Sequence, residues 1–169
     1  FKNIIRFLKG KKKRLSKKKF CAPAWIRKKH QIDYLEEPDM FHDIFGHTPL
    51  LADAKFAQFM QDFGDLGVEF IENQVVVIQL QRLYWFTIEF GLIQQQGRKV
   101  YGAGICSSFG ETNHCLENTI EVVPFNIDEV INTEYRTDVV QTLYFELKSF
   151  DQLFEEFDLF RKRIRDKAL

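Results

Sequence analysis

EEPDMFHDIFGHTPLL, residues 36–51, places His42 and His47 five positions apart among apolar side chains. The whole chain contains four histidines, so a pair this close indicates a shared role. Imidazole pairs commonly bind zinc, iron, copper or nickel. The spacing is not that of the zinc proteases, whose HExxH pattern places a glutamate directly after the first of two closer histidines. The pair therefore predicts a metal site of another kind, and two packed, hydrogen-bonded histidines are the alternative.

The same stretch predicts a short helix that begins at residues 37–39, because proline and an acidic side chain both suit a first helical turn. Gly46 and Pro49 are predicted to end it. On a straight helix with about 100° per residue, a step of five residues leaves two side chains roughly 140° apart. We therefore expect a helix that ends or tightens at Gly46, with His42 in its last turns and His47 at its end.

A third candidate ligand lies in residues 75–93, VVVIQLQRLYWFTIEFGLI, a run that is apolar nearly all round, as in a buried helix. Glu89 lies near the end of this run. A buried carboxylate without a partner is unstable or takes up a proton, and a cation relieves that cost. Two histidines and one carboxylate form the facial triad of non-haem iron(II) oxygenases. The spacing leaves two interpretations open, an iron site with His42 and His47 or a salt bridge from Glu89 to Arg82 or another basic residue.

Three segments, in this order, resemble the pterin-dependent aromatic amino acid hydroxylases. They are residues 36–51, LYWFTIEFGL at 83–92 and YGAGICSSFGE at 101–111. The bacterial phenylalanine 4-hydroxylase branch is the most similar, over about residues 20–160, and three long motifs in order are more specific than any short pattern. The resemblance implies that Fe(II) is bound by the two histidines of the first segment and the glutamate of the second, the same three side chains that the chemistry indicates.

The resemblance also implies roles around the iron. The arginine at position 27 is expected to bind the carboxylate of the substrate, for which its forked guanidinium is suited. Without the resemblance, Arg27 would be interpreted as a surface residue, and the aromatic candidates as ordinary packing. The other implied residues are Pro38, Trp85 and Ser107 for the substrate pocket, Asp43 and Tyr84 for the pterin side, and Glu111 as support for the serines.

The implied reaction is that of a phenylalanine 4-monooxygenase, which converts L-phenylalanine to L-tyrosine. Fe(II) is the implied cofactor, a tetrahydropterin (tetrahydrobiopterin or a related pterin) the implied co-substrate, and O2 the source of the oxygen atom. Tyrosine or tryptophan as substrate is the alternative within the family. Glu146 falls where phenylalanine hydroxylases usually carry an apolar pocket residue, unless a one-residue slip makes it a surface residue on a half-buried strand. Leu35 replaces the threonine of animal members, so carboxylate binding is expected to depend more on Arg27.

Charge is distributed unevenly along the chain, although the formal net charge is zero. Residues 1–30 hold 13 of the 24 basic residues and no acidic residue. The lysine run at residues 11–19 is interpreted as a solvated surface loop, and binding to phosphate groups is the other reading. A module that binds nucleic acid through this basic arm and holds a structural metal is therefore a remote alternative function. Structural zinc sites are usually closed by four ligands, often cysteines. No cysteine lies near His42 in the sequence, which argues against this alternative.

The composition favours a single domain with an aromatic interior, because 169 residues include 18 Phe, 5 Tyr and 2 Trp. The three cysteines show no CxxC spacing, which predicts free thiols in a reducing cytoplasm. No uninterrupted apolar run is long enough to span a membrane. We expect one catalytic domain over residues 1–169 that lacks further N-terminal residues, without a regulatory or tetramerisation domain. We also expect a monomer with no nucleic acid or membrane partner.

Periodicity and capping signals predict an α+β fold that is mainly helical, and the resemblance implies the catalytic-domain fold of the hydroxylase family with short strands. The glycines at positions 102 and 104 lie in a strand-like run and indicate a close approach, with substrate as the candidate. The predicted helices are 4–8, 52–65 ended by Gly64 and Gly67, 69–93, 111–118, one capped by Asn126 and one capped by Ser149. The predicted strands are 119–125 and 142–147, beside the strand-like run 100–108.

Overall fold

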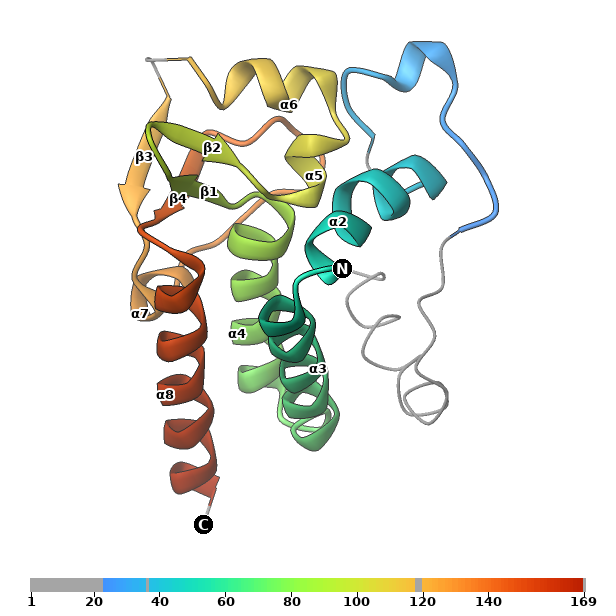
Figure 1. The fold of residues 1–169 in the computed structure, drawn as a ribbon. Helices are drawn as coiled ribbons and strands as arrows, with labels where there is room; N and C mark the ends of the chain where they lie inside the picture. Colours follow the sequence, from blue (N-terminus) through green and yellow to red (C-terminus); the bar gives the residue numbers. More distant parts are fainter. Residues whose placement is uncertain (1–22, 36, 118–119, 169) are drawn as a thin grey trace.

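The computed structural model describes residues 23–35, 37–117 and 120–168. The predicted helix at residues 4–8 and the lysine run at residues 11–19 lie outside this part of the chain. The predicted class is confirmed, because helices dominate and one small sheet of four strands accompanies them (Figure 1). In the part of the chain that is described, no helix is both long and apolar enough to cross a membrane.

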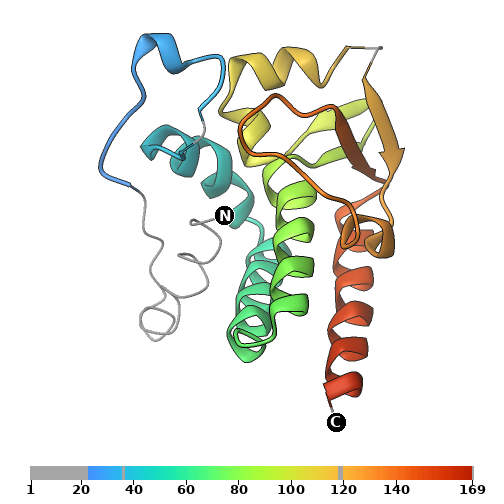
Figure 2. The same ribbon diagram turned by 180° about the vertical axis from the view of Figure 1, so that it is seen from behind.

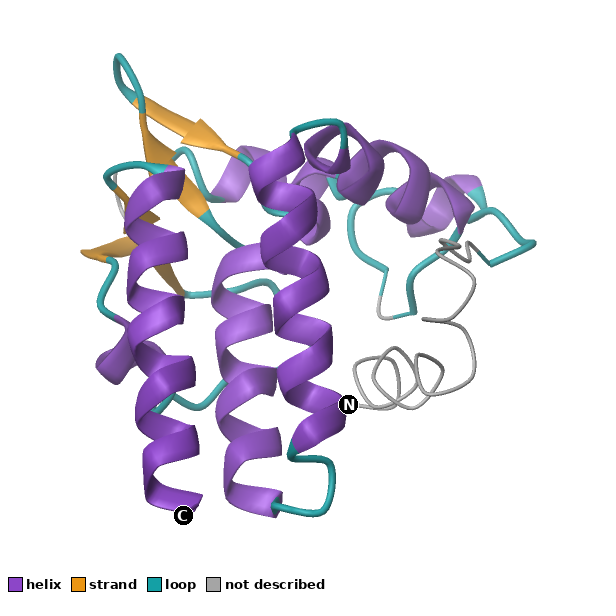
Figure 3. Cartoon of the chain, turned by 60° about the horizontal axis from the view of Figure 1, so that its bottom comes forward, coloured by secondary structure: helices purple, strands orange, loops and turns teal. Residues whose placement is uncertain are grey.

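Three long helices form one layer of the molecule. They are α3 (Ala54–Glu69), α4 (Gln74–Tyr84) and α8 (Phe150–Ala168). Figure 3 shows them side by side, with the strands at one end. The aromatic core lies between them, where the buried rings of Phe63 and Phe157 stack with centroids 5.7 Å apart. Burial of this face is what keeps α3 helical beyond its predicted end, because it outweighs the cost of about 1 kcal/mol for a glycine within a helix.

The predicted helix over residues 69–93 is wrong at both ends. The chain turns after α3, and α4 begins only after Asn73, whose side chain accepts a hydrogen bond from the backbone N–H of Val76. At the other end the helix stops at Glu89, and residues Leu92–Gln94 form strand β1 in the middle of the sheet. The last residues of the run, Leu92 and Ile93, are apolar because they are buried in the sheet and not in a helix.

The sheet has the strand order β2-β1-β4-β3. Strands β3 (Glu121–Pro124) and β4 (Leu143–Leu147) confirm the two predicted strands and pair in parallel. Strand β1 pairs in parallel with β4 and forms an antiparallel hairpin with β2 (Arg98–Val100). The turn of this hairpin contains Gly97 at a φ of 101°, where glycine carries no steric penalty. The hairpin was not predicted, because three-residue strands are too short to show alternation.

The remaining elements are short, and most of them lie around the end of α4. They are η2 (Lys29–Gln31), η3 (His42–His47), α2 (Thr48–Leu51), η4 (Trp85–Glu89), α5 (Ala103–Cys106), α6 (Phe109–His114) and α7 (Ile127–Val130). The strand-like run at residues 100–108 was mispredicted, because only its first residue is in a strand and α5 follows. The predicted helix caps at Asn126 and Ser149 are confirmed by their hydrogen bonds to the first helical N–H groups.

The N-terminal arm, residues 23–35 and 37–41, lies on the opposite side of the molecule from α8 (Figures 1 and 2). Backbone hydrogen bonds attach it to the start of α6, from the N–H of Phe109 to the carbonyl of Ile32 and from that of Gly110 to Asp33. This attachment brings residues of the arm to the same end of the molecule as η3, η4 and α5.

Candidate metal centre

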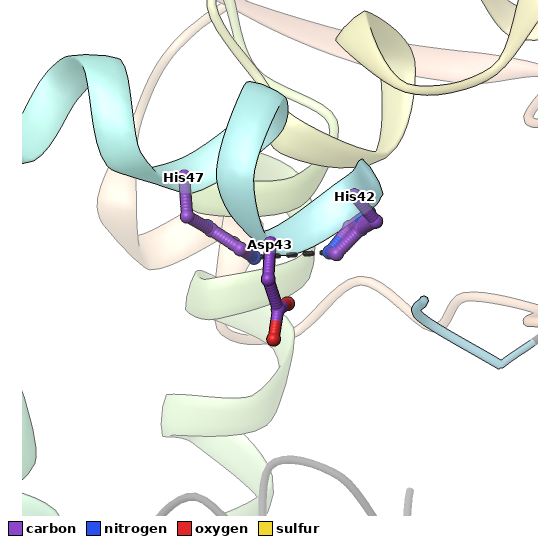
Figure 4. Close-up of side chains that lie close together, drawn as sticks. All are labelled: His42, Asp43 and His47. Atoms are coloured by element: carbon purple, nitrogen blue, oxygen red, sulfur yellow. Dashed lines mark hydrogen bonds between the residues drawn. The ribbon is translucent and has the colours of Figure 1, made fainter. Parts of the chain in front are cut away.

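His42 and His47 are the first and last residues of a π-helical turn, η3. A π-turn has i→i+5 hydrogen bonds and is wider than an α-helical turn, so side chains five apart lie on roughly the same side. The two Nε2 atoms are 3.0 Å apart, and the rings meet edge to face at 81° (Figure 4). The expected tightening at Gly46 is wrong, because the helix widens there and continues through Pro49 as α2. Proline fits at that point because it occupies the first turn of the new segment.

The start of this helix agrees with the prediction. Asp39 precedes it, is fully buried, and accepts a hydrogen bond of 2.9 Å from the backbone N–H of His42 through Oδ1. An acidic side chain at this position satisfies an N–H group that has no partner within the helix. The first histidine is therefore fixed at its backbone by the helix cap.

Glu89 ends a second π-turn, η4, in which the N–H of Phe90 bonds to the carbonyl of Trp85. Its carboxylate faces the histidine pair. Oε2 lies 3.4 Å from Nε2 of His42, and Oε1 lies 3.3 Å from Nε2 of His47. The two widened turns thus bring three donor groups from distant parts of the sequence to one point, and π-turns are frequent at functional sites.

Helix α5 packs against both turns, and glycines make this contact possible. A Cβ on Gly46 would lie 2.8 Å from the Cβ of Ala103, and a Cβ on Gly102 would lie 2.4 Å from the carbonyl oxygen of Glu89. A Cβ on Gly104 would lie 2.8 Å from the ring of Phe90. The close approach expected at Gly102 and Gly104 is therefore made by Glu89 and Phe90.

The electrostatics of the cluster couple the carboxylate to the imidazoles. Burial raises the pKa of Glu89, but the two imidazoles outweigh burial and hold that pKa well below its usual range. Burial lowers the pKa of His42, and the Glu89 carboxylate more than offsets it, so the pKa of His42 is raised. The salt bridge considered for Arg82 is not formed, since its guanidinium donates to the carbonyl of Ile131 and lies 3.8 Å from Glu134.

Asp43 is a fourth polar group near the pair (Figure 4). A carboxylate oxygen of Asp43 lies within 4.8 Å of the candidate ligand atoms of His42 and His47. Burial raises the pKa of this carboxyl, and the two histidines oppose that shift. The Glu89 oxygens lie 3.4 and 3.3 Å from the two Nε2 atoms, and on this ground we favour Glu89 over Asp43 as the third ligand.

The donor set fits a first-row transition metal. Bonds of about 2.1 Å to nitrogen or oxygen, set at right angles, separate neighbouring donor atoms by about 3.0 Å. The three separations of 3.0, 3.3 and 3.4 Å are close to this value. The mixed imidazole and carboxylate ligands match the two-histidine, one-carboxylate triad of non-haem iron. The roles of His42, His47 and Glu89 as ligands stay predictions that this geometry supports.

Arg27 lies next to the cluster and is held by two other residues. Its Nε and Nη2 donate to the two carboxylate oxygens of Asp39 at 2.9 and 2.7 Å, and its Nη1 donates to the carbonyl of Ser107. Burial alone would raise the pKa of Asp39, but the hydrogen bonds from Arg27 and His42 hold it well below its usual range. A guanidinium has five N–H groups, so two remain beyond these three contacts. The sequence did not reveal Asp39 as the partner of Arg27.

Ser107 connects these two groups, because its hydroxyl lies 2.9 Å from Nδ1 of His42 while its carbonyl accepts from Arg27. Tyr84 is buried one turn before Glu89, with its ring 6.3 Å from that of His47. Pro38 is half-buried at the helix start. These predicted site residues therefore lie on segments that meet at the cluster.

Glu146 lies apart from the cluster on the sheet. Its carboxylate pairs with Arg98 of β2 at 3.0 Å, and its side chain is 20% exposed. This position agrees with the second interpretation, a residue on a half-buried strand. It gives no support to an acidic group in the ring pocket.

Two contacts of Trp85 were not anticipated. Its indole Nε1–H donates to the side-chain oxygen of Gln141 at 3.0 Å, and its ring stacks on Tyr135 at 4.6 Å. Glu111 was expected to support the serines, but its carboxylate accepts hydrogen bonds from the backbone of Gln141 and the hydroxyl of Tyr144, and only its backbone N–H contacts Ser108. A lone glutamine in a loop carries no sequence signal, so Gln141 could not have been found from its surroundings in the chain.

Known proteins of one family are similar to this chain. The family model described as "biopterin-dependent aromatic amino acid hydroxylase" matches residues 7–168. Phenylalanine-4-hydroxylase from Chromobacterium violaceum is 44% identical over 143 residues, which are 83% of this chain and 48% of that protein. Human tyrosine 3-monooxygenase is 37% identical over 147 residues, 86% of this chain and 28% of that protein. The chain spans about half the length of the bacterial curated relatives it matches.

Solved structures of phenylalanine hydroxylases are also similar to this chain. A C. violaceum phenylalanine hydroxylase structure with bound iron(III) and oxidised 7,8-dihydrobiopterin has a TM-score of 0.79 at 41% identity, covering 91% of this chain and 57% of that one. The cold-active phenylalanine hydroxylase from Colwellia psychrerythraea 34H also has a TM-score of 0.79 at 41% identity, covering 92% and 58%.

Proposed function

The chain belongs to the biopterin-dependent aromatic amino acid hydroxylases, and from this premise we propose that it carries the active site of a phenylalanine 4-monooxygenase. The proposed reaction converts L-phenylalanine to L-tyrosine with O2 and a tetrahydropterin as co-substrates. The observation that supports it best is the convergence of His42, His47 and Glu89 from two π-turns. The iron and dihydrobiopterin of the C. violaceum structure support the choice of metal and of co-substrate.

His42, His47 and Glu89 are the residues that would hold Fe(II), through Nε2 of each imidazole and the carboxylate. Bound there, the metal would supply the oxygen-activating chemistry, with electrons from the tetrahydropterin. With the metal bound, the Ser107 hydroxyl, which lies 2.9 Å from Nδ1 of His42, would accept a hydrogen bond from that nitrogen and leave Nε2 free of a proton as a ligand. The side chains of His42, His47 and Glu89 are only 10%, 9% and 13% exposed, so the protein keeps bulk water away from them.

Arg27 binds the carboxylate of the amino acid substrate in this proposal. Asp39 and the Ser107 carbonyl hold the guanidinium in place, and its remaining N–H groups are available to the substrate. A substrate anchored by a preoriented arginine loses less entropy when it is brought to the metal. Because Ser107 contacts both Arg27 and His42, one residue links the proposed substrate anchor to one of the proposed metal ligands.

The other predicted residues keep their places in the proposal. Pro38 and Trp85 shape the pocket for the ring, and Asp43 and Tyr84 lie on the pterin side. Phenylalanine is favoured over tyrosine as the substrate for two reasons. The phenylalanine hydroxylases are the more similar relatives, at 44% against 37% identity, and the one acidic residue that suggested a polar ring pocket, Glu146, is paired with Arg98 on the sheet.

The proposal is tested by loading the chain anaerobically with Fe(II), measuring iron per chain, and then adding tetrahydrobiopterin, O2 and L-phenylalanine. We expect one iron per chain and tyrosine that depends on the pterin. Glu89→Ala should lose both, whereas the exposed Glu72→Ala should keep both. Tyrosine formed at the full rate by iron-free Glu89→Ala protein would refute the proposed site.

A further inference from the structure

Gln141 is buried, and both polar atoms of its side chain and its backbone N–H have hydrogen-bond partners. It is 5% exposed. Its backbone N–H donates to Oε1 of Glu111 at 2.9 Å, and its side-chain Oε1 accepts from the indole of Trp85 at 3.0 Å. Its Nε2 donates to the carbonyls of Arg136 and Val139, both at 2.8 Å. One acceptor and two donors are what a primary amide offers, so glutamine matches these three partners and neither a carboxylate nor an apolar side chain does.

The indole of Trp85 is fixed from more than one side. Tyr135 stacks on it with the ring planes 17° apart, and Phe90 lies against it with centroids 4.4 Å apart. The hydrogen bond to Gln141 sets the rotation of the indole between these rings. Trp85 also opens the π-turn that Glu89 closes, so an indole fixed in this way has a fixed place relative to the proposed iron ligand.

The same glutamine fastens the loop from Tyr135 to Gln141. Its two Nε2 hydrogen bonds draw the carbonyls of Arg136 and Val139 together. Between them, the carbonyl of Thr137 accepts a hydrogen bond of 2.5 Å from the hydroxyl of Tyr34 on the N-terminal arm. The loop therefore joins the arm to Trp85, and Gln141 is the residue that connects its two ends.

We propose that Gln141 is a positioning residue that fixes the Trp85 indole as a rigid wall of the ring pocket and thereby sets which aromatic ring the site accepts. This rests on the proposed function in one respect, that Trp85 lines the substrate pocket. The hydrogen bonds of Gln141 that the structure describes go to Trp85, Glu111, Arg136 and Val139, and none of these is a proposed metal ligand. The loss of Gln141 should weaken substrate binding and selectivity while leaving the metal site intact.

The test compares Gln141→Met, which keeps the side-chain size and removes the amide, with the exposed Gln95→Met as the matched control. Both are made in a Trp25→Phe background, so that Trp85 is the only remaining tryptophan. The first readout is the indole N–H resonance of Trp85 and its hydrogen exchange in iron-loaded protein, before and after L-phenylalanine is added. The second is KM and kcat for L-phenylalanine and for L-tryptophan.

We expect Gln141→Met to shift the Trp85 indole resonance and to speed the hydrogen exchange of its N–H. KM for phenylalanine should rise about tenfold, which is the factor for one buried hydrogen bond. The value of kcat should stay within about twofold of the parent. Iron per chain should be unchanged. The ratio of kcat/KM for phenylalanine to kcat/KM for tryptophan should decrease. Gln95→Met should change none of these. The effects of Gln141→Met should disappear in a Trp85→Phe background, because the shared partner is then absent.

If Gln141→Met does not fold, Gln141→Glu serves instead, since it keeps the acceptor for Trp85 and removes both donors to the loop. An indole resonance that moves while KM and selectivity stay at control values would overturn the inference. So would a Trp85 resonance that phenylalanine does not perturb in the parent protein. Failure of the proposed function has a different signature, parent protein that forms no tyrosine, and in that case a phenylalanine titration of the Trp85 resonance still decides whether Gln141 sets ring binding.

Discussion

Ser107, like Asp39, contacts both Arg27 and His42. Its hydroxyl lies 2.9 Å from Nδ1 of His42, and its backbone carbonyl accepts from Arg27. The polar partner on the far side of a ligating imidazole fixes the ring and its tautomer. Replacing the Ser107 side chain should therefore alter metal affinity while all three proposed ligands stay in the chain.

Ser107→Ala should weaken Fe(II) binding by about 10- to 100-fold, the usual cost of removing such a partner. The side-chain hydrogen bond is lost, while the carbonyl that accepts from Arg27 remains. Competition against a chelator of known affinity measures the effect, with the exposed Thr142→Ala as the control. Equal affinities in the two variants would show that the hydroxyl does not orient His42.

Arg27→Lys should raise KM for L-phenylalanine roughly 10- to 100-fold, the effect of losing one or two hydrogen bonds between charged groups. Lysine keeps the charge but cannot bind the Asp39 carboxylate and a substrate carboxylate in the same forked geometry. Iron per chain should not change. Steady-state kinetics with the exposed Arg165→Lys as the control measure this, and a loss of kcat alone would contradict a role in carboxylate binding.

Individual residues could be predicted where chemistry restricts the choice. Two nearby histidines and a carboxylate in an apolar run are unusual enough to be noticed, and the structure brings these three together. Asp39 and Gln141 were missed because each acts through a partner 12 or 56 positions away in the chain. Such pairings depend on the fold, and neither residue type is rare enough to draw attention to itself.

The two π-turns, η3 and η4, are the elements on which the site depends. A π-turn differs from the flanking α-helix by one residue, so no composition signal marks it. The five-residue histidine spacing was the only indication, and it was interpreted as the end of a helix. Strands β3 and β4 and the capped helices were predictable because their patterns are local. Helix α5 was not predictable, because the glycines beside and within it are needed for close packing against Glu89 and Phe90, a contact that local sequence does not show.

Gly46→Ala should separate η3 from α5. The new Cβ would lie 2.8 Å from the Cβ of Ala103 and 2.9 Å from its carbonyl oxygen. We expect the free energy of unfolding to fall by about 1–2 kcal/mol, since overpacking exceeds the gain in helix propensity, and iron affinity to fall with it. Urea unfolding and iron content measure both. Gly46→Ala/Ala103→Gly should recover part of the loss, and a single variant as stable as the parent would contradict the close contact.

Glu111, on α6, ties that helix to β4 and to Gln141. Burial raises the pKa of this carboxyl above its ordinary 4.5, against the hydrogen bonds from Tyr144 and Gln141. The folded state then binds this proton more tightly than the unfolded state. The resulting stabilisation is complete below pH 4.5 and is lost as the pH rises through the folded-state pKa.

The free energy of unfolding of the parent protein, relative to Glu111→Gln, should therefore decrease as the pH rises above 4.5. The glutamine variant has no proton to lose at this position, so the difference between the two isolates Glu111. Urea unfolding from pH 4 to pH 8 measures it. A difference that stays constant or grows with pH would contradict the raised pKa.

At the scale of the whole molecule, the long helices and the sheet support a site at one end. Helices α3, α4 and α8 lie side by side, and η3, η4 and α5 meet beyond the end of α4 (Figures 1 and 3). The family, the fold class and the aromatic interior followed from sequence, because long motifs and composition report on them directly. The number of strands did not, since the β1–β2 hairpin is too short to leave a periodic pattern.

The central claim is that two histidines of one π-turn and the glutamate of another bind a single metal ion. The most direct test is iron per chain after anaerobic Fe(II) loading of the parent, Glu89→Ala and Asp43→Ala proteins. We expect one iron in the parent, one in Asp43→Ala, and almost none in Glu89→Ala, because the Glu89 oxygens lie 3.4 and 3.3 Å from the two Nε2 atoms. Iron retained by Glu89→Ala and lost by Asp43→Ala would place the third ligand on the histidine turn itself and contradict the account.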